Sequence, residues 1–227
     1  MWYNKVILRH KEFIMSTTVY LIRHGESEGN LRRAFLGHTD LPLTERGRAQ
    51  ARRTAAFLAE KKPDVIYASD LLRAYQTAEA TATLFEMPII KDQGLREIFA
   101  GAWEDLLFDE IGASYPDAWR VWCEDIGNAC PTNGESTVKL QKRVVDTITR
   151  LVKENEGKTL FFFSHATPIR TFSAYVLGKT ADEIKDLPWA PNASVTEITF
   201  DGKAFSMVEY GRDDFMGEMA TRLPANV

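Results

Sequence analysis

Short apolar runs alternate with helical patterns along most of this chain, and that alternation limits its fold more than any other feature. Five runs are rich in β-branched and aromatic residues and are therefore predicted to be strands: 18–22, 64–68, 159–163, 195–200 and 204–210. The last two flank Asp201-Gly202, a pair typical of a hairpin turn. Strands that alternate with helices predict a three-layer α/β/α sandwich with a mostly parallel sheet and a C-terminal antiparallel hairpin.

Four helices can be placed between these strands from their apolar periodicity and their caps. Thr44 can cap the first helix, and Ser69 or Asp70 can cap the second, because side-chain oxygens accept bonds from the free amides of a first turn. Ser136 can cap the third, whose apolar residues closely follow a 3.6-residue period. The fourth is expected over residues 167–177.

The chain length and the lack of internal divisions indicate one domain. A chain of 227 residues is long enough to bury a single core, and no linker, repeat or low-complexity tract interrupts it. We expect residues 15–227 to form this domain and residues 1–14 to be an N-terminal extension. The stretch around 101–131 carries several tryptophans and no strand signal, so we expect a small helical cap region there, over one end of the sheet.

Net charge and cysteine content exclude several classes of protein. A formal charge of −4 and a pI near 5.7 do not favour binding to nucleic acid or to an anionic membrane. No apolar run approaches the roughly 20 residues of a membrane span. Cys123 and Cys130 match neither a disulfide framework nor a common zinc spacing. We therefore expect a cytoplasmic monomer or homodimer whose partner is a small molecule.

Three of the expected strands end in polar groups that contain arginine or histidine. The groups are Arg23-His24-Gly25, Ser69-Asp70 with Arg73, and Ser164-His165-Ala166. Carboxyl ends of parallel strands meet at one edge of a sheet, so these groups are expected to lie together. Arginine forks and helix N-termini bind phosphate, and a neutral imidazole between them can attack phosphorus. A lone histidine after a strand is nevertheless more often structural than catalytic.

Further motifs follow in order along nearly the whole chain from Met15. After Arg23-His24-Gly25 come ESEGN (26–30), GHTDLPLTERGRAQA (37–51), SDLLRAYQTAE (69–79), LREIFAGAWED (95–105), NGES (133–136) and FSHATPIR (163–170). Together these stretches resemble the histidine phosphatase superfamily, the phosphoglycerate mutase-like proteins, and the resemblance implies a phosphoglycerate mutase-like fold. Arg9-His10 repeats the Arg-His pair, but Lys11 stands where Gly25 follows His24, so His10 is assigned no function.

The resemblance also implies roles for individual residues. His24 matches the nucleophile that becomes phosphohistidine, and Glu97 matches the acid that protonates the leaving alcohol and then helps to activate water. The residues implied to hold the phosphoryl group are Arg23, Asn30, Thr39, Arg73 and His165. Of these, Arg23, Arg73 and His165 also count as catalytic, because they stabilise charge on the phosphoryl oxygens. On spacing alone, Glu97 reads instead as an exposed carboxylate paired with Arg96.

We expect neither a metal ion nor another cofactor. No histidine pair has an HxxxH or similar metal-binding spacing. Positive charge for the phosphoryl group is expected from Arg23, Arg73 and a protonated His165. Flanking arginines should also lower the pKa of His24 and so keep it neutral for attack.

The expected function is metal-independent hydrolysis of a small phosphomonoester through phosphohistidine, as in the broad-specificity and α-ribazole phosphatase branch that the chain resembles. A cofactor-dependent phosphoglycerate mutase is one alternative, and a non-catalytic phosphate-binding module is another. Against the mutase, residues 98–101 (IFAG) stand where mutases resemble one another in basic and aromatic residues that grip a carboxylate. Asp105 and Ala166-Thr167 replace glycines common in the family, which affects the expected specificity rather than the chemistry.

Overall fold

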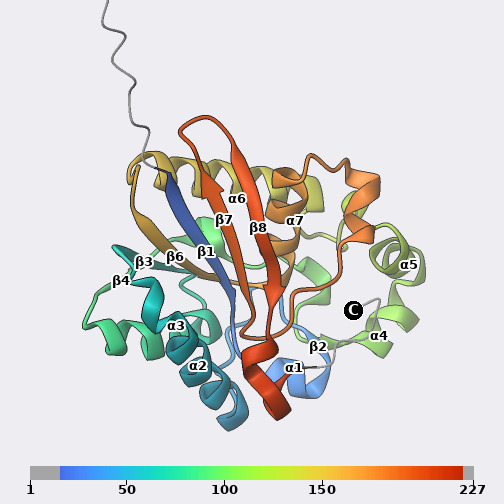
Figure 1. The fold of residues 1–227 in the computed structure, drawn as a ribbon. Coiled ribbons are helices and arrows are strands. Elements are labelled where there is room, and N and C mark those ends of the chain that lie inside the picture. The colour runs from blue at the N-terminus through green and yellow to red at the C-terminus, as the bar shows by residue number, and fades with distance from the viewer. Residues whose placement is uncertain (1–15, 222–227) are drawn as a thin grey trace, which may run out of the picture.

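A six-stranded mixed sheet lies at the centre of the molecule, between layers of helices (Figure 1). The structure is a computed structural model and describes residues 16–221, so the expected N-terminal extension of residues 1–14 lies outside the described residues. The strands are β1 (Thr17–Arg23), β2 (Ala34–Phe35), β3 (Val65–Ala68), β4 (Ile89–Lys91), β5 (Leu106–Leu107), β6 (Thr159–Ser164), β7 (Val195–Phe200) and β8 (Phe205–Arg212).

The strand order in the main sheet is β4-β3-β6-β1-β7-β8. The first four strands of this order are parallel to one another, whereas β7 is antiparallel to β1 and β8 is antiparallel to β7. The predicted mostly parallel sheet with a C-terminal hairpin is therefore confirmed. The short strand β4 was not predicted, because it is a three-residue edge strand with two exposed residues and so has little apolar pattern.

Helices cover both faces of the sheet. They are α1 (Glu28–Arg32), α2 (Glu45–Leu58), α3 (Leu72–Phe85), α4 (Phe108–Ser114), α5 (Pro116–Glu124), α6 (Thr137–Lys153) and α7 (Ala166–Val176). Apolar residues of α2 and α3 pack in one core cluster, and those of α6 and α7 pack in the other. Three layers are therefore present, as the sequence predicts.

The sheet is buried on both faces, and the run Phe161–Phe163 shows why its central strand is continuously apolar. Successive side chains of a strand point to opposite faces. Phe162 accordingly packs with α6 and α7, while Phe161 and Phe163 pack with α2 and α3. All three rings are 0% exposed, as expected for a parallel strand covered by helices on both sides.

Two of the predicted helix caps are confirmed. The hydroxyl of Thr44 accepts a bond from the amide of Gly47 at the start of α2, at 3.0 Å. The hydroxyl of Ser136 accepts one from the amide of Lys139 at the start of α6, at 3.3 Å. Each bond satisfies one of the amides that have no partner within the helix.

The predicted cap of α3 by Ser69 or Asp70 is wrong. The cap position is Leu71, and the amide of Leu72 donates instead to the carboxylate of Asp40, at 2.6 Å. The carboxylate of Asp70 pairs with Arg96 instead. Asp40, in the loop before α2, therefore caps α3, although α2 and β3 lie between them in the chain.

Residues 101–131 contain α4 and α5, but also β5, which pairs with β2 and was not predicted. Their aromatic rings form a cluster around Trp103, which is 0% exposed. The ring of Trp103 lies edge-on to Phe35 at 5.5 Å and to Trp122 at 6.1 Å between centroids.

None of the helices between residues 16 and 221 has the length and apolar character needed to cross a membrane.

We predict that Phe162→Ala lowers the free energy of unfolding by about 3–5 kcal/mol, because it leaves a cavity in a core that is closed on both sides. Val208→Ala is the control: Val208 is 56% exposed on β8, so its truncation should change stability by less than about 0.5 kcal/mol. Urea unfolding of both variants tests this. Similar losses in the two variants would contradict the description of the core.

Candidate active site

The polar groups at the strand ends lie side by side, because β6 runs between β3 and β1 in the sheet. Arg23 is the last residue of β1, and its Cα partner on β6 is Ser164. The amide of Ser69, just after β3, donates to the carbonyl of Phe163 near the end of β6, at 2.8 Å. The prediction that these groups meet at the carboxyl edge of the sheet is confirmed.

A pocket opens at this edge and brings five of the predicted site residues together: Arg23, His24, Asn30, Arg73 and Glu97. Its remaining lining is Ala34, Phe35, Leu36, Gly37, Phe108, Trp122, Ala166, Thr167 and Trp189. Two predicted residues, Thr39 and His165, are not part of this lining. His165 lies directly behind it, since its ring centroid is 5.2 Å from that of His24.

The tautomer of His24 follows from its hydrogen bond. Nδ1 lies 2.7 Å from the carbonyl oxygen of Gly25, which can only accept, so Nδ1 carries the proton and Nε2 has a free lone pair. Burial, followed by the charges of Arg73 and Arg23, holds the pKa of His24 well below the usual value for histidine. His24 is therefore a neutral imidazole whose unprotonated nitrogen is Nε2.

Gly25 is required for a close backbone contact rather than for a left-handed turn. A Cβ at this position would lie 2.5 Å from the carbonyl oxygen of Gly47, in the first turn of α2. The amide of Gly25 donates to the hydroxyl of Thr77 at 3.0 Å. Because Gly25 supplies the carbonyl that sets the tautomer of His24, its fixed position also fixes the imidazole.

The guanidinium groups of Arg23 and Arg73 are buried and are held by backbone carbonyls. Arg23 donates to Ala190 at 2.6 Å, and Arg73 donates to Gly37 at 2.8 Å and Thr39 at 2.9 Å. Their side chains therefore have fixed directions. Nε of Arg23 is buried and has no hydrogen-bond partner among the described residues.

Neither guanidinium forms an ion pair with a carboxylate in the described part of the chain. Burial lowers the pKa of Arg23 and of Arg73 to about 10, so both remain charged at neutral pH. Two buried positive charges without a bonded counter-charge are costly. An anion with several oxygen acceptors would offset that cost and satisfy the unpaired N–H.

His165 has a lowered pKa as well, which disfavours the protonated imidazole expected from the sequence. Burial and the nearby Arg73 hold its pKa well below the usual value. Its Nε2 lies 2.8 Å from the hydroxyl of Ser69, and its buried Nδ1 has no partner among the described residues. The Ser69 hydroxyl accepts from the amide of Leu71 and has no other acceptor for its own proton there, so donation to Nε2, with the proton of His165 on Nδ1, uses that hydroxyl fully.

Glu104 organises the loop that holds Arg73, a role that sequence reasoning missed. Its carboxylate accepts the amides of His38, Thr39 and Ala100 at 2.7–3.0 Å. The hydroxyl of Thr39 also donates to it, at 2.7 Å. Thr39 thus supports Arg73 through its carbonyl, and its own contact with phosphate stays a prediction. The position of Glu104 beside Trp103 in the GAWED stretch was the available signal.

Asn30 lines the pocket with its amide group held in one orientation. Its Oδ1 accepts the amide of Ser27 at 3.1 Å and the side-chain amide of Asn192 at 3.1 Å, so its NH₂ group remains as a donor. Asn192 also donates to the carbonyl of His24. Sequence reasoning missed Asn192, because nothing near it in the chain marks it as a partner of His24, which directly follows β1.

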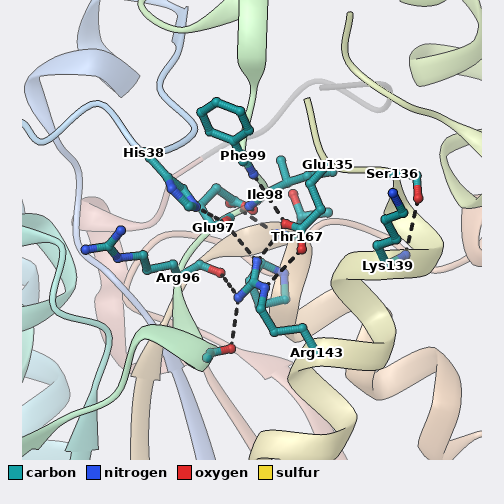
Figure 2. A network of polar contacts seen from close by, with 12 residues as sticks. His38, Arg96, Glu97, Ile98, Phe99, Glu135, Ser136, Lys139, Arg143 and Thr167 are labelled. Atoms are coloured by element: carbon teal, nitrogen blue, oxygen red, sulfur yellow. Dashed lines mark hydrogen bonds and ion pairs between the residues drawn. The ribbon is translucent and has the colours of Figure 1, made fainter. Parts of the chain in front are cut away.

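Glu97 lies in an irregular segment between β4 and β5, and its carboxylate accepts two backbone amides. The donors are Ile98 at 2.8 Å and Thr167, in the first turn of α7, at 3.3 Å (Figure 2). The alternative reading, an exposed pair with Arg96, is wrong, because Arg96 forms a two-pronged pair with Asp70 at 2.6 and 2.5 Å.

The two departures from the family pattern lie in different places. Asp105 has φ of +62°, the left-handed region that favours glycine, so the chain keeps the backbone shape without the glycine. Its carboxylate pairs with Arg32 at the surface. Ala166 and Thr167 line the pocket, so this second departure alters the pocket wall directly.

Beyond the arginines, four aromatic rings line the pocket and are called the aromatic wall below: Phe35, Phe108, Trp122 and Trp189. Trp122 and Trp189 are nearly parallel, with ring centroids 6.3 Å apart and 25° between their planes. The guanidinium of Arg170 stacks on Trp189 at 4.3 Å. Within residues 16–221, no three His, Cys, Asp or Glu side chains are grouped to hold a metal ion.

Comparison with known proteins gives a consistent result. Residues 19–213 match the family model described as histidine phosphatase superfamily (branch 1). Phosphoserine phosphatase 1 of Hydrogenobacter thermophilus is 34% identical over 158 residues, which cover 70% of this chain and 75% of that protein. Adenosylcobalamin/alpha-ribazole phosphatase of Escherichia coli is 30% identical over 164 residues, covering 72% and 81%. The solved structure of Bacillus stearothermophilus YhfR is similar with a TM-score of 0.85 and 33% identity, covering 88% of this chain and 99% of that one.

We predict that acid destabilises the fold through its buried histidines. The folded-state pKa of His24 and of His165 lies below the unfolded value of about 6.5, so below that pH the unfolded state binds more protons. The free energy of unfolding should fall as the pH drops from about 6.5, by up to about 1.4 kcal/mol per pH unit for each histidine. Urea unfolding at pH 7.5, 6.5 and 5.5 should show a shallower fall for His24→Asn. An unchanged slope would contradict the neutral, buried state of His24.

Proposed function

The chain belongs to branch 1 of the histidine phosphatase superfamily and is a phosphatase of small phosphorylated metabolites, and from this premise we propose that it works through a phosphohistidine formed on His24. The observation that carries the proposal is the pair of buried guanidiniums of Arg23 and Arg73, neither ion-paired with a carboxylate of the described residues, beside an imidazole with a free Nε2. The charges favour a phosphoryl group, and the lone pair supplies the nucleophile.

In the first step the phosphoryl oxygens accept bonds from Arg23, Arg73 and the Nδ1–H of His165. Nε2 of His24 attacks phosphorus, so that an N–P bond forms while the bond from phosphorus to the alcohol oxygen breaks. Glu97, in its protonated form, gives its proton to that oxygen. A dianionic phosphoryl group beside His165 would also raise the pKa of that imidazole and strengthen its bond.

In the second step water replaces the alcohol. Glu97, now a carboxylate, takes a proton from the water as its oxygen attacks phosphorus, and the N–P bond to His24 breaks. Inorganic phosphate leaves, and both residues return to their starting protonation states. The same three donors, on Arg23, Arg73 and His165, serve both steps, because each step places charge on the same phosphoryl oxygens.

The pocket lining supports hydrolysis over mutase activity. Among the residues that the structure describes, its only cationic side chains are Arg23 and Arg73, both at the phosphate end. Phosphoglycerate carries a carboxylate that would need a further cation. Ile98 and Ala100, which follow Glu97, are both 0% exposed and belong to the core.

We also propose that the reaction needs no metal ion, since the two arginines can neutralise a phosphoryl dianion without one. We further propose that the protein acts as a monomer or a homodimer. No nucleic acid is expected to take part, in line with the net charge of −4.

We predict metal-independent hydrolysis that depends on His24. In EDTA the protein should release phosphate from p-nitrophenyl phosphate and from members of a panel that includes phosphoserine and α-ribazole phosphate. His24→Ala should reduce the rate at least about 1000-fold, because the nucleophile is lost. His10→Ala, in the other Arg-His pair (Arg9-His10), is the matched control and should keep full activity.

The same assay separates the alternatives. Loss of activity in EDTA with recovery on adding a divalent ion would refute metal independence. Isomerisation of 3-phosphoglycerate in the presence of 2,3-bisphosphoglycerate, with little release of phosphate, would make the protein a mutase. No turnover of any compound would make it a phosphate-binding module.

We predict that the aromatic wall binds the alcohol part of the substrate. Trp189→Ala should raise KM for 1-naphthyl phosphate roughly 5- to 10-fold, because a ring that stacks on tryptophan loses about 1 kcal/mol or slightly more. KM for a small alkyl phosphate should change little. Leu177→Ala, at a 47% exposed position, is the control. Equal changes for aryl and alkyl substrates would refute this role.

A further inference from the structure

Arg143, on α6, lies outside the pocket and yet contacts the segment that carries Glu97 at several points (Figure 2). Its Nη1 donates to the carbonyls of Gly94 at 2.9 Å and Arg96 at 3.1 Å. Its Nη2 donates to the carbonyl of Glu97 itself, at 3.2 Å. An irregular segment cannot satisfy its carbonyls within a helix or a sheet, so this guanidinium takes the place of a regular hydrogen-bond pattern.

Glu135 fixes the orientation of Arg143. Its carboxylate accepts Nε at 3.0 Å and Nη2 at 2.7 Å, a two-pronged pair that suits the planar guanidinium. With these bonds all five N–H groups of Arg143 are used. Arg143 therefore has no donor left for a ligand, and its contacts all serve the protein itself.

The Glu97 segment is also held on its other side. The amide of Glu135 donates to the carbonyl of Phe99 at 2.8 Å, so that Glu135 contacts the chain just after Glu97. The imidazole of His38 donates from Nε2 to the carbonyl of Glu97 at 2.9 Å. The carbonyl of Glu97 thus accepts hydrogen bonds from Arg143 and His38. Its carboxylate accepts two more from backbone amides.

We propose that Arg143, locked by Glu135, is a positioning residue that sets Glu97 at the distance and angle needed to protonate the leaving alcohol. The inference rests on the role proposed above for Glu97. In the first step, misplacing the general acid removes only the contribution of proton transfer, so its effect on that step depends on the leaving group. An alkoxide needs the proton as the bond breaks, whereas p-nitrophenolate is a stable anion and leaves without it.

The test compares kcat/KM, which reports on the steps up to formation of the phosphohistidine, for an alkyl phosphate and for p-nitrophenyl phosphate. Arg143→Met should lower kcat/KM for the alkyl ester roughly 10- to 100-fold and change kcat/KM for the nitrophenyl ester less than about 3-fold. Glu135→Gln, which keeps the shape of its side chain, should show a smaller loss of the same kind. Lys142→Met is the matched control: it lies next to Arg143 on α6, is 77% exposed and should leave both values unchanged.

Glu97→Gln gives the reference for complete loss of the acid. If Glu97→Gln lowers kcat/KM selectively for the alkyl ester and Arg143→Met lowers kcat/KM equally for both substrates, the positioning role is refuted while the proposed function stands. If Glu97→Gln itself lowers kcat/KM equally for both substrates, Glu97 is not the leaving-group acid and the proposed mechanism fails with the inference. Should Arg143→Met fail to fold, as urea unfolding would reveal, Glu135→Gln carries the same comparison.

Discussion

Two buried guanidiniums without a carboxylate partner, those of Arg23 and Arg73, are the constraint on which the rest of this structure depends. Charges removed from water are stable only where other dipoles or charges replace it. Here the carbonyls of Gly37, Thr39 and Ala190 supply part of the stabilisation that water would otherwise give. The same positive charge, together with burial, keeps the neighbouring imidazole of His24 neutral and therefore nucleophilic. In the proposed mechanism, one electrostatic arrangement thus produces both the affinity for a phosphoryl group and the reactivity toward it.

The structure uses one device twice to hold functional groups on irregular segments. Arg73 donates to carbonyls of the loop around Gly37, and the carboxylate of Glu104 accepts the amides of that loop. Arg143 donates to carbonyls of the Glu97 segment, and Glu135 accepts from Arg143 in turn. In each case an arginine and a glutamate replace the hydrogen bonds of a regular element. The sheet brings the ends of its strands together. The hydrogen bonds of these arginines and glutamates hold the loops between the strands in place.

Local patterns in the sequence predicted the central strands, the three layers and the polar groups at the strand ends, because strand runs and helical periods are short-range signals. What was missed depends on contacts between distant segments. The amide at the start of α3 is capped by Asp40, 32 residues earlier in the chain, so no local pattern could identify it. Glu104 and Arg143 act through backbone groups that only the fold brings near them. The neutral state of His165 follows from complete burial, which its neighbours in the sequence do not reveal.

The most direct test of this account is to locate the phosphoryl group on the enzyme during turnover. The reaction with a ³²P-labelled aryl phosphate would be stopped in alkali, in which phosphohistidine survives, and the label assigned by peptide mapping and by NMR of the modified ring. The account predicts that the label lies on Nε2 of His24, because Nδ1 donates its proton to Gly25. Label on His165 or on another residue, or turnover without any labelled enzyme, would contradict it.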